Sequence, residues 1–303
     1  MRIVVTGGAG FIGSTLVDRL VRDGHEVTVL DDLSSGRNRN SEARLHVMDV
    51  RDPAVGAVIE ESRPEVVCHL AAQISVRKSV ADPVHDARLN VEGTVNVIEA
   101  ARRAGARKVV YASSVAVYGR PSIIPVPAGA ATDPRSPYAA SKLSGEIYLS
   151  AFSGLYGLEY TTLVLSNVYG PRQSPEGEAG VVSIFTDALL SGRRTVVYGD
   201  GSQTRDYVYV DDVVDGFARA CGPDGNGSRF NLGTGVQTTD RRLHTLVAAA
   251  AGVPDEPDFE PARLGDLPAM AVDPAPAFEG LGWRPAYDLA AGLKATVAWA
   301  MGA

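Results

Sequence analysis

Short apolar runs alternate with helix-like patterns along the first half of the chain. Residues 3–5 form a β-branched run that predicts a buried strand, and apolar residues at helical spacing over 14–21 predict a helix after it. The same alternation predicts strands at 26–30, 45–48, 66–70, 109–112 and 161–165, with helices at 54–61, 83–105 and 138–156. Because parallel strands need crossover connections, this order predicts an α/β fold with a doubly wound, Rossmann-like parallel sheet.

Beyond residue 167 the alternation gives way to loops and shorter elements. The pattern predicts helices at 181–190, 211–220, 241–251 and 289–301, with strands at 196–198 and 229–231. We therefore expect a dinucleotide-binding unit over 1–166, with returning segments near 196–221, and a smaller α+β substrate lobe mainly over 167–303.

A glycine-rich stretch connects the first predicted strand to the first helix. Gly8, Gly10 and Gly13 have the spacing G-x-G-x-x-G. In this motif a tight turn lets the backbone approach a pyrophosphate, and the helix N-terminus offers free N–H groups to it. A glycine-rich turn without a ligand is the alternative interpretation.

Polar side chains at the ends of the predicted strands support a dinucleotide. The second strand ends in Asp31, 18 residues after Gly13, where a carboxylate that binds a ribose is expected. This charge would repel a 2′-phosphate, so we expect NAD, while Arg37 and Arg39 keep NADP as the alternative. Ligands of such folds bind at the carboxyl ends of the strands. We therefore expect one crevice to be faced by Asp31, Asp49, which could reach the adenine amino group, and residues 71–73 and 113–114.

Tyr138 and Lys142 stand four residues apart at the head of a predicted helix and share one face. An ammonium group near a phenol lowers the phenol pKa, which makes the phenol a better base near neutral pH. Ser114, at the end of the fifth strand, has a hydroxyl that can share a substrate proton with Tyr138. Such a pair is also common on protein surfaces, but its position after a dinucleotide turn favours catalysis.

Composition narrows the classes of partner. Hydrophobic residues make up 45% of the 303 residues, and the formal net charge is −7. The sequence has no run of like charges and no apolar run near the roughly 18 residues of a membrane span, so we expect neither a nucleic-acid nor a membrane partner. The first strand leaves no room for a leader, so we expect a cytoplasmic protein. Cys68 and Cys221 lack metal-ligand spacing; we expect reduced thiols and no metal site.

Taken together, these motifs resemble those of the extended short-chain dehydrogenase/reductase family, and within it the NAD-dependent nucleotide-sugar epimerases. The similarity extends nearly end to end. It is carried by residues 6–13, 69–72, Asn90 with 93–94, 113–114 with 117–119, Tyr138 with Lys142, 167–172, 205–207, Asn231 with Gly233, 263–268, and 281–283 with Pro285.

The resemblance implies an isomerase that epimerises UDP-hexoses at C4, such as UDP-glucose and UDP-galactose, through a 4-keto intermediate. Tyr138 would remove the 4-hydroxyl proton while NAD takes a hydride from C4; the sugar would then turn, and both would return to the opposite face. Dehydratases and decarboxylases of the family carry an acid two positions after the serine, whereas this chain has Val115 and Ala116 after Ser114. Met270, at the position that closes the sugar pocket, is flexible and not aromatic, so the expected substrates include N-acetylated UDP-hexoses.

The resemblance also implies the site residues. The catalytic residues are Ser114, Tyr138 and Lys142. The cofactor-binding set is Gly7, Gly10, Phe11, Ile12, Asp31, Asp32, Ser34, Gly36, Asp49, Val50, Leu70, Ala71, Ala72, Gln73, Asn90, Tyr138 and Lys142. The substrate-binding set is Gln73, Ser114, Tyr138, Asn167, Val182, Tyr198, Arg205, Arg263 and Asp266. In it, the arginines bind phosphates, Asp266 binds the uridine ribose and Tyr198 stacks on the base; a surface ion pair is the alternative for either arginine.

Other activities stay open. A UDP-glucuronate 4-epimerase would share every catalytic residue, and a net NAD-dependent oxidoreductase of a keto-sugar would consume its cofactor. A dinucleotide-sensing regulatory protein is disfavoured because Tyr138 and Lys142 are both present. The helices over 83–105 and 138–156 resemble those that pair into a four-helix contact in relatives, so we expect a homodimer.

Overall fold

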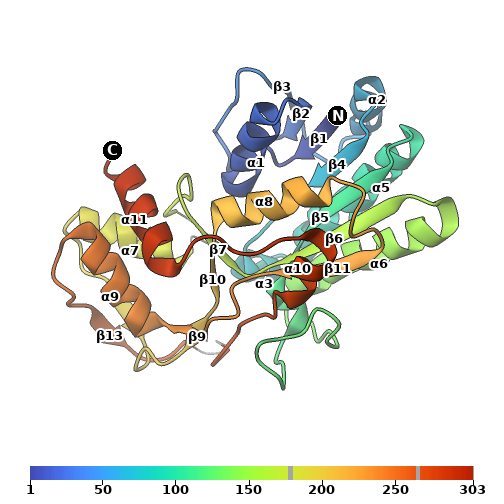
Figure 1. The fold of residues 1–303 in the computed structure, drawn as a ribbon. Coiled ribbons are helices and arrows are strands. Elements are labelled where there is room, and N and C mark those ends of the chain that lie inside the picture. The colour runs from blue at the N-terminus through green and yellow to red at the C-terminus, as the bar shows by residue number, and fades with distance from the viewer. Residues whose placement is uncertain (177–179, 264–266, 303) are drawn as a thin grey trace.

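A seven-stranded sheet forms the centre of the molecule in the computed structural model, which describes residues 1–176, 180–263 and 267–302 (Figure 1). All its neighbouring strands pair in parallel, as predicted, so every carboxyl end lies at the same edge. In spatial order the strands are β11 (Ser228–Leu232), β6 (Glu159–Leu165), β5 (Lys108–Ser114), β4 (Val66–His69), β1 (Arg2–Thr6), β2 (Glu26–Asp31) and β3 (Arg44–Val47).

Helices cover both faces of the sheet (Figure 1). One face carries α1 (Phe11–Arg22) and α8 (Val210–Ala220), which pack against each other, and the other carries α2 (Val55–Ser62), α5 (Gly93–Arg103) and α6 (Pro137–Tyr156). Ile3 and Val5 of β1 belong to the core with α1 and α8, whereas Val4 between them belongs to the core with α2 and α5. Because both faces of the sheet are buried, the sequences of its strands are continuous apolar runs.

The long helix predicted over 83–105 is divided in the structure. It consists of α4 (Pro83–Ala87), a π-helical turn η1 (Arg88–Glu92) and α5, and a helix that the sequence did not predict, α3 (Val76–Ala81), precedes it. A π turn adds a residue to one helical turn and rotates the following side chains, and it is frequent at functional sites. This turn contains Asn90, which is 1% exposed.

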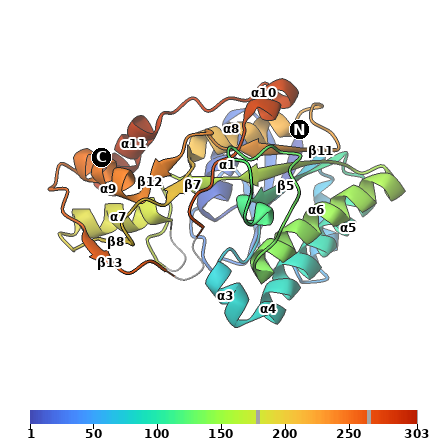
Figure 2. The same cartoon turned by 90° about the horizontal axis from the view of Figure 1, so that it is seen from below.

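Most elements after residue 167 gather at one end of the molecule (Figures 1 and 2). Here β7 pairs with β10 and β8 with β13 in parallel, whereas β9 and β12 are antiparallel. The elements are β7 (Asn167–Tyr169), α7 (Val181–Leu190), β8 (Val196–Tyr198), β9 (Thr204–Arg205), β10 (Tyr207–Tyr209), β12 (Thr238–Thr239), α9 (Asp240–Ala251), β13 (Asp258–Glu260) and α11 (Leu289–Ala300).

Only part of the segment near 196–221, which we expected to return to the sheet, does so. α8 does pack on the sheet, but β8 pairs with β13 away from it, and β11 is the strand that extends the sheet. α10 (Ala275–Leu281) packs against β11 and α8. In the described part of the chain, none of the helices has both the length and the apolar character that a membrane span needs.

Trp283 ties the C-terminal segment to α8. Its side chain is fully buried, and its Nε1 donates a hydrogen bond to the backbone oxygen of Asp212 at 2.7 Å. The carboxylate of Asp212 accepts hydrogen bonds from the backbone N–H groups of Ala286 and Tyr287. The end of the chain is therefore anchored on the sheet through one indole and one carboxylate.

Replacing Trp283 by Phe should lower the free energy of unfolding by about 1–3 kcal/mol, because the change removes a buried donor and leaves a cavity. The matched control is Trp299→Phe on α11, whose ring is 48% exposed and whose replacement should cost less than about 0.5 kcal/mol. Urea unfolding followed by circular dichroism measures both, and equal losses would contradict the anchoring role.

Candidate active site

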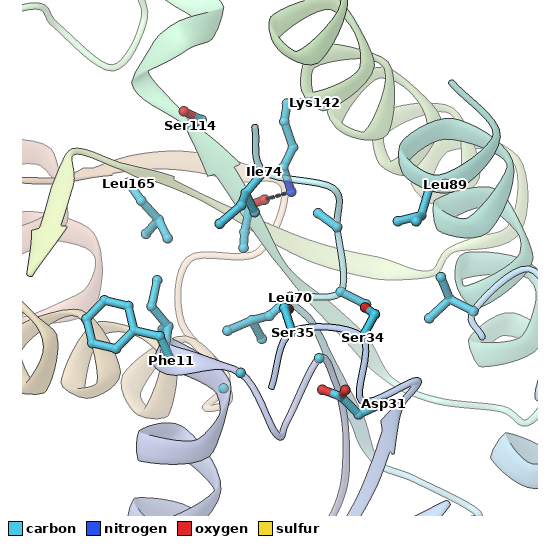
Figure 3. A pocket seen from close by; sticks show the side chains of 18 of the residues that line it. Phe11, Asp31, Ser34, Ser35, Leu70, Ile74, Leu89, Ser114, Lys142 and Leu165 are labelled. Atoms are coloured by element: carbon cyan, nitrogen blue, oxygen red, sulfur yellow. Dashed lines mark hydrogen bonds between the residues drawn. The ribbon is translucent and has the colours of Figure 1, made fainter. Parts of the chain in front are cut away.

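A pocket lies at the carboxyl edge of the sheet, where the strand order reverses between β1 and β4 (Figure 3). Its lining comes from the ends of β1, β2, β4, β5 and β6 and from the first turns of α1 and α6. Figure 3 shows Ser114 and Lys142 on one side of it and Phe11 and Asp31 on the other. This is the position at which doubly wound folds bind ligands.

The pocket brings together the predicted cofactor and catalytic residues. Its lining includes Gly7, Gly10, Phe11, Ile12, Asp31, Asp32, Ser34, Asp49, Val50, Leu70, Ala71, Ala72, Ser114, Tyr138 and Lys142. The other predicted residues lie outside this lining: Gly36, Gln73, Asn90, Asn167, Val182, Tyr198, Arg205 and Arg263. Asp266 lies outside the described residues. Ser113, which we expected to face the crevice, also lines the pocket, and lining residues that the sequence did not predict include Met48, Ile74, Leu89, Leu165 and Ser166.

The glycine turn is built around Gly7, which corrects the expected pattern. Gly7 has a φ of +71°, and a Cβ there would lie 2.7 Å from the backbone nitrogen of Ala71. A Cβ on Gly13 would lie 2.0 Å from the oxygen of Gly7, so both positions require glycine. Gly8, which we placed in the motif, packs against Val29. The cradle opens at the N-terminus of α1 and fits a diphosphate.

Asp31 ends β2 inside the pocket and is 7% exposed. Its carboxylate accepts hydrogen bonds from the backbone N–H groups of Ala9 (2.9 Å) and Leu33 (2.8 Å). Burial raises the pKa of Asp31, and these two hydrogen bonds oppose the rise. Asp49 is paired with Arg51, whose Nε lies 3.0 Å from each carboxylate oxygen and whose guanidinium lowers the pKa of Asp49.

Lys142 carries its amine into the pocket from α6 (Figure 3). The side chain is buried, and Nζ donates to the backbone oxygen of Ala112 at 2.9 Å and lies 5.1 Å from the centre of the Tyr111 ring. Burial lowers the pKa of Lys142 to about 8, against the opposing charges of Asp86 and Glu146. The amine therefore depends on these neighbours to stay charged.

Tyr138 lies in the first turn of α6, and Ser136 caps this helix through a hydrogen bond from the backbone N–H of Ala139. Burial raises the pKa of Tyr138, the Ser114 hydroxyl opposes the rise, and the charge of Asp86 adds to it. The lowered pKa that we expected from Lys142 is thus absent in the protein alone. The ammonium is instead directed at Ala112.

Val115 and Ala116 follow β5 and begin a short 3₁₀ helix, η2 (Val115–Tyr118). Among the described lining residues, the carboxylates are Asp31, Asp32 and Asp49, which belong to the dinucleotide end of the pocket. The groups beside Ser114 that can transfer a proton are therefore a phenol and an amine. This set suits removal and return of one hydroxyl proton, and it supplies no acid for an elimination.

Asn90 and Gln73 turn away from the pocket and shape its wall. Asn90 accepts a hydrogen bond from the backbone N–H of Gln73 (2.8 Å) and donates to its backbone oxygen (2.9 Å). The Gln73 amide donates to Ser75 O (2.9 Å) and to Asp86 Oδ1 (2.8 Å). Asp86 was not among the predicted site residues, although its position four residues before Asn90 on one helical segment was a signal.

His69 is a packing residue. It is 1% exposed, and its ring nitrogens bond to the hydroxyls of Thr6 (2.6 Å) and Thr94 (2.9 Å). Burial lowers its pKa to about 3, so the ring is neutral. Cys68 and Cys221 are buried free thiols with their sulfurs 3.4 Å apart. Within 1–176, 180–263 and 267–302, no group of His, Cys, Asp and Glu side chains could hold a metal ion.

The other predicted substrate residues lie in the second half of the chain. The Arg263 guanidinium lies 3.6 Å from the centre of the Tyr198 ring and covers one of its faces. Arg205 Nη1 donates to the backbone oxygens of Thr204 and Leu267, both at 2.8 Å. Val182 lies in the first turn of α7 and is 1% exposed. Met270, which we expected to close the sugar pocket, is 2% exposed and packs with Val117, Val126 and Val272, outside the lining of the pocket at the sheet edge.

Known proteins share this architecture over the whole chain. The profile of the NAD dependent epimerase/dehydratase family matches residues 3–233. A UDP-glucose 4-epimerase of Mycolicibacterium smegmatis is 55% identical, with 98% of this chain and 97% of the relative covered. A Thermotoga maritima UDP-glucose 4-epimerase structure with UDP-glucose has a TM-score of 0.97 at 43% identity, covering 100% of this chain and 99% of that one. A Thermus thermophilus UDP-glucose 4-epimerase structure with NAD has a TM-score of 0.94 at 42% identity, with 100% of both chains covered. This chain therefore belongs to the NAD dependent epimerase/dehydratase family.

Proposed function

We propose that the protein is an NAD-dependent 4-epimerase that interconverts UDP-glucose and UDP-galactose. One observation carries the proposal: Ser114, Tyr138 and Lys142 line the same pocket as the dinucleotide cradle, and among the described lining residues none beside them is a carboxylate. The high identity to a UDP-glucose 4-epimerase supports the same activity. N-acetylated UDP-hexoses stay within the proposed substrate range.

The residues of the pocket fit NAD. Gly7, Gly10 and the N-terminus of α1 would hold the diphosphate, and Asp31 would bind a ribose hydroxyl. Leu70, Ala71 and Ala72 would form the wall that the cofactor follows toward Lys142. When bound, NAD supplies a hydride acceptor and donor for C4 of the sugar.

Tyr138 would take the proton of the sugar 4-hydroxyl and later return it. Ser114 would hydrogen-bond the same sugar oxygen, and the positive charge of Lys142 would stabilise the phenolate. Because one base serves both directions, the reaction needs no second acid, which fits Val115 and Ala116. Burial of the pocket would keep water from the 4-keto sugar.

The second half of the chain would hold the nucleotide while the sugar turns. Arg205 and Arg263 would bind the diphosphate, with the backbone N–H of Val182 at the start of α7 as a further donor. Tyr198 would stack on the base through the face that Arg263 leaves open. Asn167 and Asp266 complete the proposed set. We accordingly propose a cofactor unit over 1–166 and a substrate lobe over 167–303, in a cytoplasmic enzyme.

A homodimer is proposed through α3, α4 and α6, which lie side by side (Figure 2). These helices expose apolar side chains, with Val80 63%, Val84 59% and Ile147 61% exposed. Burying them against a second copy would remove this apolar surface from water.

A UDP-glucuronate 4-epimerase is less well supported. Such an enzyme needs a group to meet the carboxylate at C6, and Arg172 is a residue type that could supply it. The guanidinium of Arg172 instead bonds to Asp18 of α1 at 2.6 Å.

Purified protein given UDP-glucose without added NAD should form UDP-galactose until the two sugars reach equilibrium, because each turnover regenerates a retained cofactor. Chromatography of the sugar nucleotides measures the conversion. Absence of product with and without added NAD would refute the proposed function. Stoichiometric build-up of reduced cofactor would instead indicate the net oxidoreductase.

Replacing Tyr138 by Phe should lower kcat by about 10²–10⁴-fold with little change in KM, because the general base is lost and the ring is kept. The matched control is Tyr156→Phe on the same helix, whose side chain is 56% exposed and whose replacement should leave kcat unchanged. Bound NAD, released by denaturation, should be equal in both variants. Full activity of Tyr138→Phe would mean that another group is the base.

Light scattering should give roughly twice the 31.9 kDa chain mass for the wild type at micromolar concentration. Val84→Glu together with Ile147→Glu should shift it to one chain mass, because two charges would be buried in the contact. Val236→Glu, at a residue 60% exposed outside these helices, is the control and should stay dimeric. A single-chain mass for the wild type would exclude the dimer.

A further inference from the structure

Asp86 of α4 is a buried carboxylate next to the proposed catalytic residues. It is 1% exposed, and its Oδ1 accepts hydrogen bonds from Gln73 Nε2 (2.8 Å) and Asn90 Nδ2 (3.1 Å). Within the described part of the chain, its Oδ2 is buried without a hydrogen-bond partner. A buried carboxylate oxygen without a partner is costly, so its presence calls for a reason beyond packing.

Hydrogen bonds connect Asp86 to the head of α6. Asn90 Nδ2 also donates to Ser141 Oγ at 3.1 Å, and Ser141 Oγ donates to the backbone oxygen of Tyr138 at 3.0 Å. α3, α4 and the π turn η1 all pack against α6. The carboxylate thus joins the wall segment at Gln73 to the turn that carries Tyr138.

The carboxylate of Asp86 is buried, whereas the other charged groups on the neighbouring elements of the same segment are exposed. From α6 it is faced by Tyr138 and Lys142, with Glu146 one turn further along that helix. The other described charged groups of α3, α4, η1 and the residue between α3 and α4 are exposed: Arg77, Lys78, Asp82, His85, Arg88 and Glu92. The charge of Asp86 raises the pKa values of both Lys142 and Tyr138. Solvent screens the exposed charges far more strongly than Asp86.

We propose that Asp86 is a positioning residue for the epimerase reaction, an inference that rests on the proposed function. Its carboxylate fixes the wall at Gln73 against the first turn of α6, and its charge keeps the Lys142 amine protonated beside Tyr138. The side-chain amide of Gln73 holds this carboxylate in place, and other groups bind the sugar.

Replacing Asp86 by Asn tests the charge with little change of shape. The Asn oxygen can still accept from Gln73 and Asn90, and its NH₂ takes the place of the oxygen that has no partner. Loss of the negative charge lowers the pKa values of both Tyr138 and Lys142, and their two titrations form the two limbs of the kcat/KM profile. Both limbs should therefore move to lower pH by roughly one unit.

The control is Glu92→Gln, which removes a charge from the adjoining turn η1 where the side chain is exposed, and whose profile should match the wild type. An unchanged profile for Asp86→Asn, at any level of activity, would overturn the proposal. Asp86→Ser, which also lacks the charge and is smaller, takes the same test if Asp86→Asn does not fold.

A spectroscopic titration separates this proposal from the proposed function, because it needs no turnover. The tyrosinate absorbance of the wild type minus that of Tyr138→Phe reports the ionisation of Tyr138. The same difference measured in the Asp86→Asn background should give a midpoint at lower pH, and an equal midpoint would refute the inference. Failure of the wild type to epimerise any UDP-hexose would refute the proposed function while leaving this titration valid.

Discussion

The buried ammonium of Lys142 is the constraint on which the pocket depends. Removing such a charge from water costs several kcal/mol, so it needs compensation inside the protein. The structure supplies the Ala112 carbonyl at 2.9 Å, the face of Tyr111, and the charges of Asp86 and Glu146. These partners come from β5, α4 and α6, so the elements around the pocket must keep their mutual positions for the amine to stay charged.

Glu146 extends this requirement to the far edge of the sheet. Ser113 of β5 donates a hydrogen bond to Glu146, and Arg229 of β11 donates to its other oxygen, with Nε at 2.7 Å. Glu146 is 7% exposed, so this ion pair is largely shielded from solvent. The strand that returns from the second half of the chain thus neutralises a carboxylate that also acts on Lys142, which links the chain's second half to the proposed chemistry.

The sequence predicted what depends on local periodicity and on motif spacing. The strands β1 to β6, the helix carrying Tyr138 and Lys142, and the crevice at the strand ends follow from such patterns. Which side chains bind to each other depends on tertiary contacts, and no spacing of residues along the sequence encodes these contacts. Hence the motif spacing indicated Gly8, whereas Gly7 has the positive φ. The π turn at Asn90 was not predicted, and the amide of Gln73, which we expected to meet the ligand, faces Asp86. Arg263 over Tyr198 is a contact of the same kind.

Burial gives the proposed base a property that the sequence did not suggest. Desolvation raises the pKa of Tyr138, and the Lys142 ammonium is directed at Ala112, so the phenol is neutral in the protein alone. Positive charge that arrives with a ligand in the same pocket would add to that of Lys142 and lower this pKa, because an opposite charge stabilises a phenolate. A base that becomes active only in the loaded pocket suits the proposed reaction. In it, the proton leaves the sugar 4-hydroxyl oxygen while the hydride leaves C4.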